Sequence, residues 1–270
     1  MWKRGTKVTA KPVMAVVAFP SSEEDIRKRF SINRKASSEH FSDHHPTIFS
    51  RDGLNIASWN VQNVMSLLDR LGFNFFACSP EERAGVDTLR YDVQFGVIQR
   101  LFQGDLDFLC CQEVPKGLYD YVTANIGDGF SVVFDEKYTN SNEGGYMCIS
   151  RGTGTIVSTI PILDKFERRD GTTGHKLNCV LINTVSGFQI LNIHLPVKCQ
   201  DVSMKCITDS DQLVKDGGEV IFCGDFNYSA GRSKCLIESL EFSLGEEEQF
   251  VSEQRGGVDH CFSARFRRSP

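Results

Sequence analysis

A carboxylate and a carboxamide stand one residue apart where an apolar segment ends, at Asp225 and Asn227. The apolar segment covers residues 220–223, and Gly224 separates it from the polar pair. Side chains two residues apart on an extended chain point to the same side, so both groups can face one reacting group. A strand that ends in polar side chains is one way in which a rigid sheet presents a site. The same residue types are common in turns, so this segment alone fits a turn equally well.

Three further apolar segments also end in polar side chains, and another polar pair lies near the C-terminus. The segment LNIASWN ends at Asn60, DLDFLCCQE ends at Glu113, and FQILNIH ends at His194. The C-terminal pair is Asp259 and His260, in GGVDHCF. Each of these side chains can bind a metal ion, orient water or donate a proton. We therefore consider the five segments together rather than one by one.

The order and spacing of these segments resemble the endonuclease/exonuclease/phosphatase superfamily, whose members have the DNase I-like fold. The resemblance extends from about Leu54 to His260. It implies an α/β fold of two stacked mixed β-sheets flanked by helices. The residue pattern favours the same α/β sandwich, because short apolar strands alternate with amphipathic segments. Residues 91–102 have helical apolar spacing, for example, and residues 189–194 are predicted to form a short apolar strand.

The resemblance also implies a role for each polar side chain. Phosphodiester hydrolysis needs a nucleophilic water and neutralisation of the phosphoryl oxygens, which a hard divalent cation with oxygen ligands supplies. Glu113 is the first candidate metal ligand because it ends a rigid strand, and Asn60 can bind the same metal through its amide oxygen or donate to a phosphate from its nitrogen. The expected cation is Mg²⁺, for which Mn²⁺ can substitute. Asp225 orients or deprotonates the attacking water, and Asn227 contacts the phosphate. His194 donates to a phosphoryl oxygen as charge develops there.

Asp259 and His260 fit two different segments of the family. In the terminal motif of the family, a histidine contacts the phosphate and the preceding aspartate completes the network, which makes both residues catalytic here. Val258 stands where that motif has a serine. The segment GVDHCF also resembles an earlier strand of the family, in which case His260 points into packing or into solvent. Both interpretations remain open at this point.

The resemblance predicts a Mg²⁺-dependent phosphodiester hydrolase with a nucleic acid or nucleotide substrate. Residues 67–93 are similar to the nocturnin and deadenylase branch, which favours a 3′-exoribonuclease acting on RNA. A DNA-repair phosphodiesterase and an inositol or lipid phosphatase have the same metal site, and a catalytically impaired binding protein follows if the terminal histidine motif is absent. Single-stranded RNA needs aromatic side chains for base stacking, and the candidates are Phe73, Phe75, Phe76 and Tyr146.

Length and composition place the chain among ordinary globular proteins. Its 270 residues are 40% hydrophobic and 24% charged, which fits one domain with a large core. We expect a partly flexible N-terminal extension over residues 1–50 and the catalytic domain over residues 51–270. The net charge of −5 argues against a broad nucleic-acid-binding surface but allows a local basic cleft.

The ten cysteines predict a reducing compartment rather than a disulfide framework. Several lie inside apolar strands, where a free cysteine behaves as a small hydrophobe, and no C-x-x-C pair is present. We therefore expect an intracellular protein, cytoplasmic or nuclear. No apolar segment reaches the length of a membrane span. The sequence does not indicate an oligomeric state.

Overall fold

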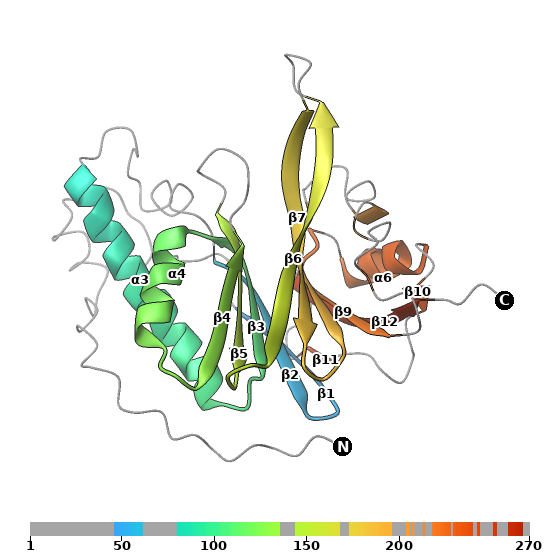
Figure 1. Ribbon diagram of the computed structural model, residues 1–270, viewed down its shortest axis with the longest axis horizontal. Helices are drawn as coiled ribbons and strands as arrows, with labels where there is room; N and C mark the ends of the chain where they lie inside the picture. The colour runs from blue at the N-terminus through green and yellow to red at the C-terminus, as the bar shows by residue number, and fades with distance from the viewer. Residues whose placement is uncertain are drawn as a thin grey trace.

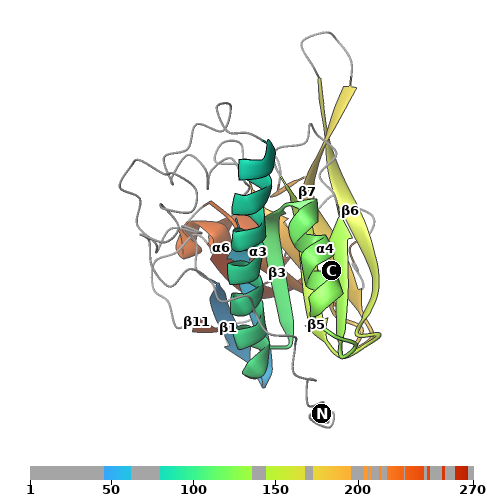
Figure 2. The ribbon, with the colours of Figure 1, turned by 90° about the vertical axis from the view of Figure 1, so that its left-hand side faces the viewer.

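A computed structural model describes most of the chain from residue 46 onward. The described residues are 46–61, 80–135, 144–167, 173–195, 218–227, 229–239, 242–243, 251–252 and 259–266, with 204, 205, 207 and 213. They form two stacked β-sheets with helices on the outer faces (Figures 1 and 2). This is the α/β sandwich that the sequence predicts.

The first sheet has six strands, and one neighbouring pair in it is parallel. The strand order is β11-β1-β2-β3-β5-β4, and β2 and β3 are the parallel pair. The bounds are Thr47–Arg51 for β1, Leu54–Asn60 for β2, Phe108–Val114 for β3, Phe130–Asp135 for β4, Gly145–Arg151 for β5 and Val251–Ser252 for β11.

The second sheet repeats this pattern, again with one parallel pair. The strand order is β10-β12-β9-β8-β7-β6, and β8 and β9 are the parallel pair. The bounds are Ile156–Glu167 for β6, Thr173–Thr184 for β7, Gln189–His194 for β8, Glu219–Asp225 for β9, Phe242–Ser243 for β10 and Asp259–Phe266 for β12.

Three helices are described with their full bounds. They are α3 (Pro80–Gln103), α4 (Lys116–Asn125) and α6 (Ala230–Ser239). The helix predicted over residues 91–102 is confirmed, although α3 begins eleven residues earlier than predicted. Helices α3 and α4 pack on the outer face of the first sheet, and α6 packs on that of the second (Figure 1). None of the described helices is long and apolar enough to cross a membrane.

Three apolar layers follow from the period-two alternation of the strands. Strand β9 shows the pattern: Ile221 and Cys223 lie in the core between the sheets, whereas Val220 and Phe222 lie in the core beneath α6. A one-residue shift in register would exchange these two faces. The register of each strand therefore determines which of its side chains reach the space between the sheets.

Strand β1 changes one predicted boundary. All five residues of β1, Thr47–Arg51, pair with β2, so the sheet begins before residue 51. The boundary predicted at residue 51 thus falls inside a strand, and residues 47–50 belong to the folded domain. The rest of the predicted N-terminal extension, residues 1–45, lies outside the described residues.

Candidate active site

The two parallel strand pairs bring four polar side chains to one edge of the sandwich. In the first sheet, Asn60 at the end of β2 lies opposite Gln112 of β3, and Glu113 follows directly. In the second sheet, His194 at the end of β8 lies opposite Asp225 at the end of β9. Because parallel strands end at the same edge, each sheet delivers two polar residues there.

Asn60 connects the carboxylates of the two sheets. Its amide nitrogen Nδ2 lies 3.2 Å from Glu113 Oε1 and 3.2 Å from Asp225 Oδ2. Asn60 and Asp225 are buried, and Glu113 is half-buried. Both carboxylates therefore accept from the same N–H₂ group of Asn60. Their negative charges face one region, which favours positively charged or hydrogen-bond-donating groups there.

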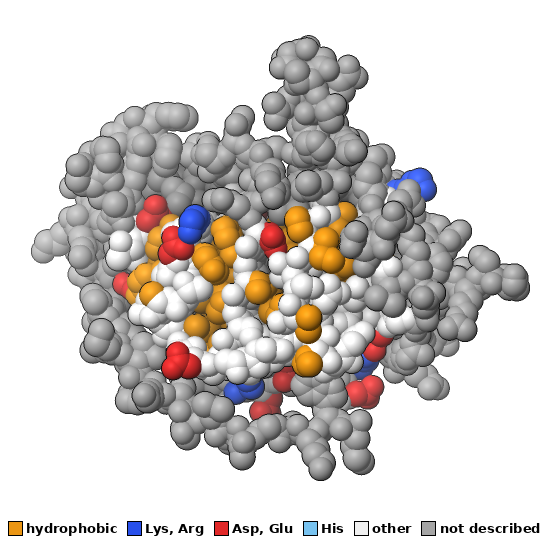
Figure 3. Space-filling model, viewed as in Figure 1, with side chains coloured by type: hydrophobic (Ala, Val, Ile, Leu, Met, Phe, Trp, Pro, Cys, Tyr) orange, Lys and Arg blue, Asp and Glu red, His pale blue; other side chains and the backbone are white. Residues whose placement is uncertain are grey.

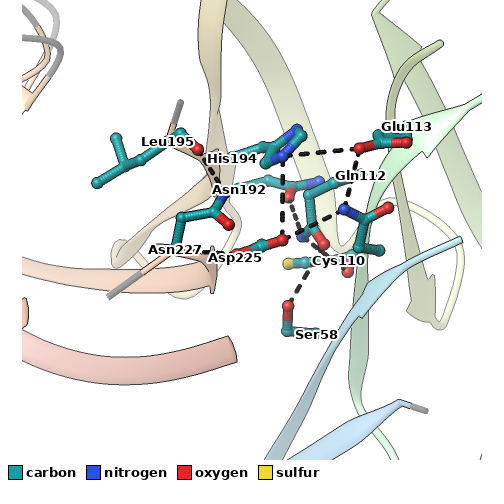
Figure 4. Close-up of polar contacts among 10 residues, drawn as sticks. Ser58, Cys110, Gln112, Glu113, Asn192, His194, Leu195, Asp225 and Asn227 are labelled. Atoms are coloured by element: carbon teal, nitrogen blue, oxygen red, sulfur yellow. Dashed lines mark hydrogen bonds and ion pairs between the residues drawn. The ribbon is translucent and has the colours of Figure 1, made fainter. Parts of the chain in front are cut away.

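His194 faces both carboxylates from the end of β8 (Figure 4). Its Nε2 lies 3.7 Å from Glu113 Oε1 and 3.9 Å from Asp225 Oδ2. Its side chain is 17% exposed and that of Glu113 is 20% exposed, whereas that of Asp225 is only 3% exposed. From the solvent, His194 and Glu113 are therefore reached first, with Asp225 behind them.

Asn227 holds Asp225 in place through the backbone. Its amide N–H donates to Asp225 Oδ1 over 2.9 Å, and its side-chain Nδ2 donates to the carbonyl oxygen of Leu195 over 2.7 Å. Asp225 thus keeps one oxygen on this hydrogen bond and turns the other toward Asn60 and His194. The contact between Asn227 and a phosphate stays a prediction, since its Nδ2 is bonded to Leu195 in this structure.

Two of these residues have backbone conformations that side chains other than glycine rarely adopt. The φ angle is +54° at Glu113 and +51° at Asn227. Residues other than glycine persist in this region only where their surroundings impose it, and such residues concentrate at functional sites. At Glu113 the register of β3 also shifts between Cys111 and Val114, a bulge that redirects the side chain.

Two glycines allow close backbone approaches beside the site. A Cβ at Gly144 would lie 2.4 Å from the carbonyl carbon of Glu113. A Cβ at Gly224 would lie 2.0 Å from the carbonyl oxygen of Ile193, in the neighbouring strand β8. Gly224 therefore lets β9 lie close enough to β8 for Asp225 to reach His194.

A buried polar cluster that sequence reasoning missed lies directly beneath the site. Gln112 Nε2 donates to Asn192 Oδ1 over 2.7 Å, and Asn192 Nδ2 donates to the carbonyl oxygens of Cys111 (3.0 Å) and Met147 (3.2 Å). Asn192 belongs to β8 and Gln112 to β3, so these bonds join the two sheets. The sequence signal that could have revealed this cluster was a side-chain amide at a buried position inside each of two apolar strands, Gln112 in β3 and Asn192 in β8.

Tyr146 is buried beside the site, so its predicted role in base stacking is wrong. The ring lies in the core between the sheets and is 3% exposed. Burial raises the pKa of the Tyr146 hydroxyl well above its usual value, and the nearby Glu113 and Asp225 charges raise it further. Tyr146 therefore stays neutral and packs behind the carboxylates. The other stacking candidates, Phe73, Phe75 and Phe76, lie outside the described residues.

The structure does not bring His260 to the site. Strand β12 runs antiparallel to β9, with Asp259 opposite Asp225 and His260 opposite Gly224. Because neighbouring residues of a strand face opposite sides, His260 lies on the face away from Asp225. Its ring is buried, and the ring centroid lies 5.8 Å from that of Phe226 and 5.8 Å from that of Phe262.

This position corrects the catalytic assignment of His260 and favours the second interpretation, in which GVDHCF is the earlier strand of the family. The backbone of Asp259 lies opposite Asp225 at the end of β12.

The donor set at this edge suits a hard divalent cation. Glu113 and Asp225 contribute carboxylate oxygens, and Asn60, whose Nδ2 faces both of them, carries an amide oxygen that is also a hard ligand. Among the described residues, no three His, Cys, Asp or Glu side chains form a cluster that could hold a metal ion. Mg²⁺ needs no such cluster, because it binds one or two carboxylates and keeps several waters. The residues therefore fit Mg²⁺ better than a metal that needs nitrogen or sulfur ligands.

Solved structures share this architecture. An endonuclease/exonuclease/phosphatase family protein from Bacteroides thetaiotaomicron superposes with a TM-score of 0.51 at 16% identity, over 82% of this chain and 83% of that one. The chain therefore has the endonuclease/exonuclease/phosphatase fold. The endonuclease/exonuclease/phosphatase from Bacteroides vulgatus superposes with a TM-score of 0.50 at 13% identity, over 77% of this chain and 85% of that one.

The 2′,3′-cyclic phosphatase ANGEL2 superposes with a TM-score of 0.47 at 16% identity, over 73% of this chain, and this chain spans 60% of the ANGEL2 chain. No protein-family model matches the sequence, and no curated protein matches it. The endonuclease/exonuclease/phosphatase fold predicted from the ordered segments is thus confirmed by structure rather than by sequence similarity.

Proposed function

We propose that this protein is a Mg²⁺-dependent phosphodiester hydrolase. The observation that carries the proposal is the convergence of Asn60, Glu113, His194 and Asp225 from four strands of two sheets. Two carboxylates, an amide and an imidazole within about hydrogen-bonding reach of one another are the groups that phosphoryl transfer to water requires.

Each side chain has a chemical task that its position supports. Glu113 and Asn60 would hold the cation, which supplies charge neutralisation on the phosphoryl oxygens when it is bound. Asp225 is buried and held through Oδ1 by Asn227, so its Oδ2 is oriented to accept a proton from water. His194 is half-buried, and its Nε2, which lies beside both carboxylates, can donate to a phosphoryl oxygen bound there.

We propose RNA or a nucleotide as the substrate class. The sequence similarity of residues 67–93 to the deadenylase branch supports this, although residues 67–79 lie outside the described residues. On the face shown in Figure 3, described Lys and Arg side chains are scattered rather than gathered into a patch. Together with the net charge of −5, this favours a short substrate bound at the site over a long duplex bound across the surface.

Turnover of a generic phosphodiester tests the hydrolase proposal. Bis(p-nitrophenyl) phosphate should be hydrolysed with Mg²⁺ or Mn²⁺ and not after chelation. A panel of poly(A), abasic-site DNA, 5′-tyrosyl DNA and an inositol polyphosphate then separates the exoribonuclease from the DNA-repair phosphodiesterase and from the inositol or lipid phosphatase. Preferential cleavage of poly(A) would support RNA as the substrate class. Preferential cleavage of another member of the panel would contradict it and indicate the enzyme class that acts on that member.

A second candidate is a catalytically impaired protein that binds phosphodiesters. The observation that favours it is the position of His260, which leaves His194 as the histidine at the site among the described residues. Binding of poly(A) without metal-dependent hydrolysis of any panel member would support this alternative. Equilibrium binding measured beside turnover on the same preparation distinguishes the two.

A further inference from the structure

Four buried cysteines form a row across the core between the two sheets. Cys110 and Cys148 are directly opposite each other on the antiparallel strands β3 and β5, and Cys223 and Cys261 are directly opposite on β9 and β12. All four lie in the same apolar cluster. The row therefore consists of two cross-strand pairs, one from each sheet, that face each other.

Hydrogen bonds between thiols connect these pairs into one continuous row. The Cys110 thiol is hydrogen-bonded to the thiols of Cys148 and Cys223. The Cys223 thiol is also hydrogen-bonded to the thiol of Cys261. Each sulfur is thus in contact with the next. Neither metal binding nor the proposed hydrolysis uses any of these four groups.

The Cys223–Cys261 pair has the geometry of a cross-strand disulfide. Directly opposite residues of antiparallel strands have Cα atoms about 4.5–5.5 Å apart, and disulfides span Cα separations of about 4.4–6.8 Å. The pair can therefore close without moving either strand far. The same geometry applies to Cys110 and Cys148, which lie deeper because β3 is a central strand of its sheet.

Access favours the pair on β12. The neighbour of β12 on its outer side, β10, pairs only with Arg265 and Phe266. Among the described residues, 259–264 thus have a strand on one side only. Local opening is easiest where backbone hydrogen bonds are fewest, so Cys261 is the member of the row that a small oxidant reaches first.

We propose that this row is an oxidation site at which hydrogen peroxide forms a Cys223–Cys261 disulfide. Local opening of β12 lets the Cys261 thiol lose its proton to water, and the thiolate attacks one peroxide oxygen. The O–O bond breaks, the departing hydroxide takes up a proton and leaves as water, and Cys261 becomes a sulfenic acid. The sulfur of Cys223 then displaces the hydroxyl group, and an S–S bond replaces the S–O bond with loss of a second water. Two thiols lose two electrons, and hydrogen peroxide is reduced to two waters.

The disulfide would join β12 to β9 two residues before Asp225. Its loop closes over residues 223–261, so it removes conformational freedom from the unfolded chain. Oxidation should therefore raise the midpoint of thermal unfolding by roughly 5 °C or more, and reductant should reverse the rise. This expectation does not depend on whether the protein is a hydrolase.

Peptide mapping of the wild-type protein tests the proposal directly. The reduced full-length chain is treated with hydrogen peroxide, capped with N-ethylmaleimide and digested without reductant for mass spectrometry. We expect a peptide containing Cys223 cross-linked to one containing Cys261, with Cys179 recovered as a thiol. Recovery of both Cys223 and Cys261 as thiols, under conditions that oxidise the exposed Cys235, would overturn the proposal.

Two alanine variants provide the matched comparison. Cys261→Ala should lose both the cross-link and the peroxide-dependent rise in unfolding temperature. Cys179→Ala should keep both, because Cys179 is equally buried but lies opposite Ile162 and Ile193 rather than another cysteine. A rise in unfolding temperature that persists in Cys261→Ala would assign the effect to another residue. The wild-type map stands without either variant, so failure of one to fold leaves the test intact.

Discussion

Asn60 Nδ2, at the end of β2 in one sheet, lies 3.2 Å from Asp225 Oδ2, at the end of β9 in the other. The two residues are 165 positions apart in the chain. Both side chains are buried, so this hydrogen bond fixes the spacing between the two halves of the site. The chemistry proposed for the site depends on this spacing, because neither sheet alone provides the full set of groups.

Asp225→Asn should lower kcat on bis(p-nitrophenyl) phosphate by roughly 10²–10⁴. The amide keeps an oxygen that can accept from the Asn227 N–H, so the backbone contact survives while the proton acceptor is lost. Steady-state kinetics checks this, with Asp128→Asn in an exposed turn as the control. An Asp225→Asn protein that turns over at the parent rate would exclude Asp225 as the group that activates water.

Glu113→Gln should raise the Mg²⁺ concentration needed for half-maximal activity, because a carboxylate ligand becomes a neutral amide. Titration of activity against Mg²⁺ after chelator treatment measures the shift. Binding of Mn²⁺, followed by its paramagnetic effect on water relaxation, gives a readout independent of turnover. Unchanged Mn²⁺ affinity in Glu113→Gln would remove Glu113 from the metal site.

His194→Ala and His260→Ala should have different effects. Loss of His194 removes a donor beside both carboxylates and should lower kcat by roughly 10²–10³. Loss of His260 removes a ring packed against Phe226 and Phe262, so it should lower the unfolding temperature and leave kcat nearly unchanged. Kinetics and thermal unfolding of both variants decide the matter. Equal losses of kcat would return His260 to the catalytic set.

Asn192→Ala should destabilise the protein by roughly 2–4 kcal/mol, because it removes three hydrogen bonds between buried groups. The groups affected are Gln112 Nε2 and the carbonyl oxygens of Cys111 and Met147. Urea unfolding measures the change, and Asn125→Ala at the partly exposed end of α4 is the control. Similar stabilities for the two variants would show that the cluster does not hold the sheets together.

The sequence by itself determined the fold and four residues that meet at the site. Apolar segments that end in Asn60, Glu113, His194 and Asp225 carry a local signal, because a strand presents a polar side chain at the edge of the sheet where its apolar pattern stops. Their order along the chain indicated the endonuclease/exonuclease/phosphatase fold, which the structure confirms. The helical spacing of apolar residues also located the helix at residues 91–102, and short apolar segments located the strands around the site.

Tertiary structure alone decided the side of the sheet to which each remaining residue belongs. His260 and Asp259 are adjacent in sequence, and only the register of β12 against β9 shows that His260 faces the aromatic core. Asn192 and Gln112 each look like a polar residue inside an apolar strand, and their pairing across 80 residues follows from the stacking of the sheets. The left-handed backbone at Glu113 likewise arises from a bulge between neighbouring strands. These features depend on which strands become neighbours, and a local residue pattern does not contain that information.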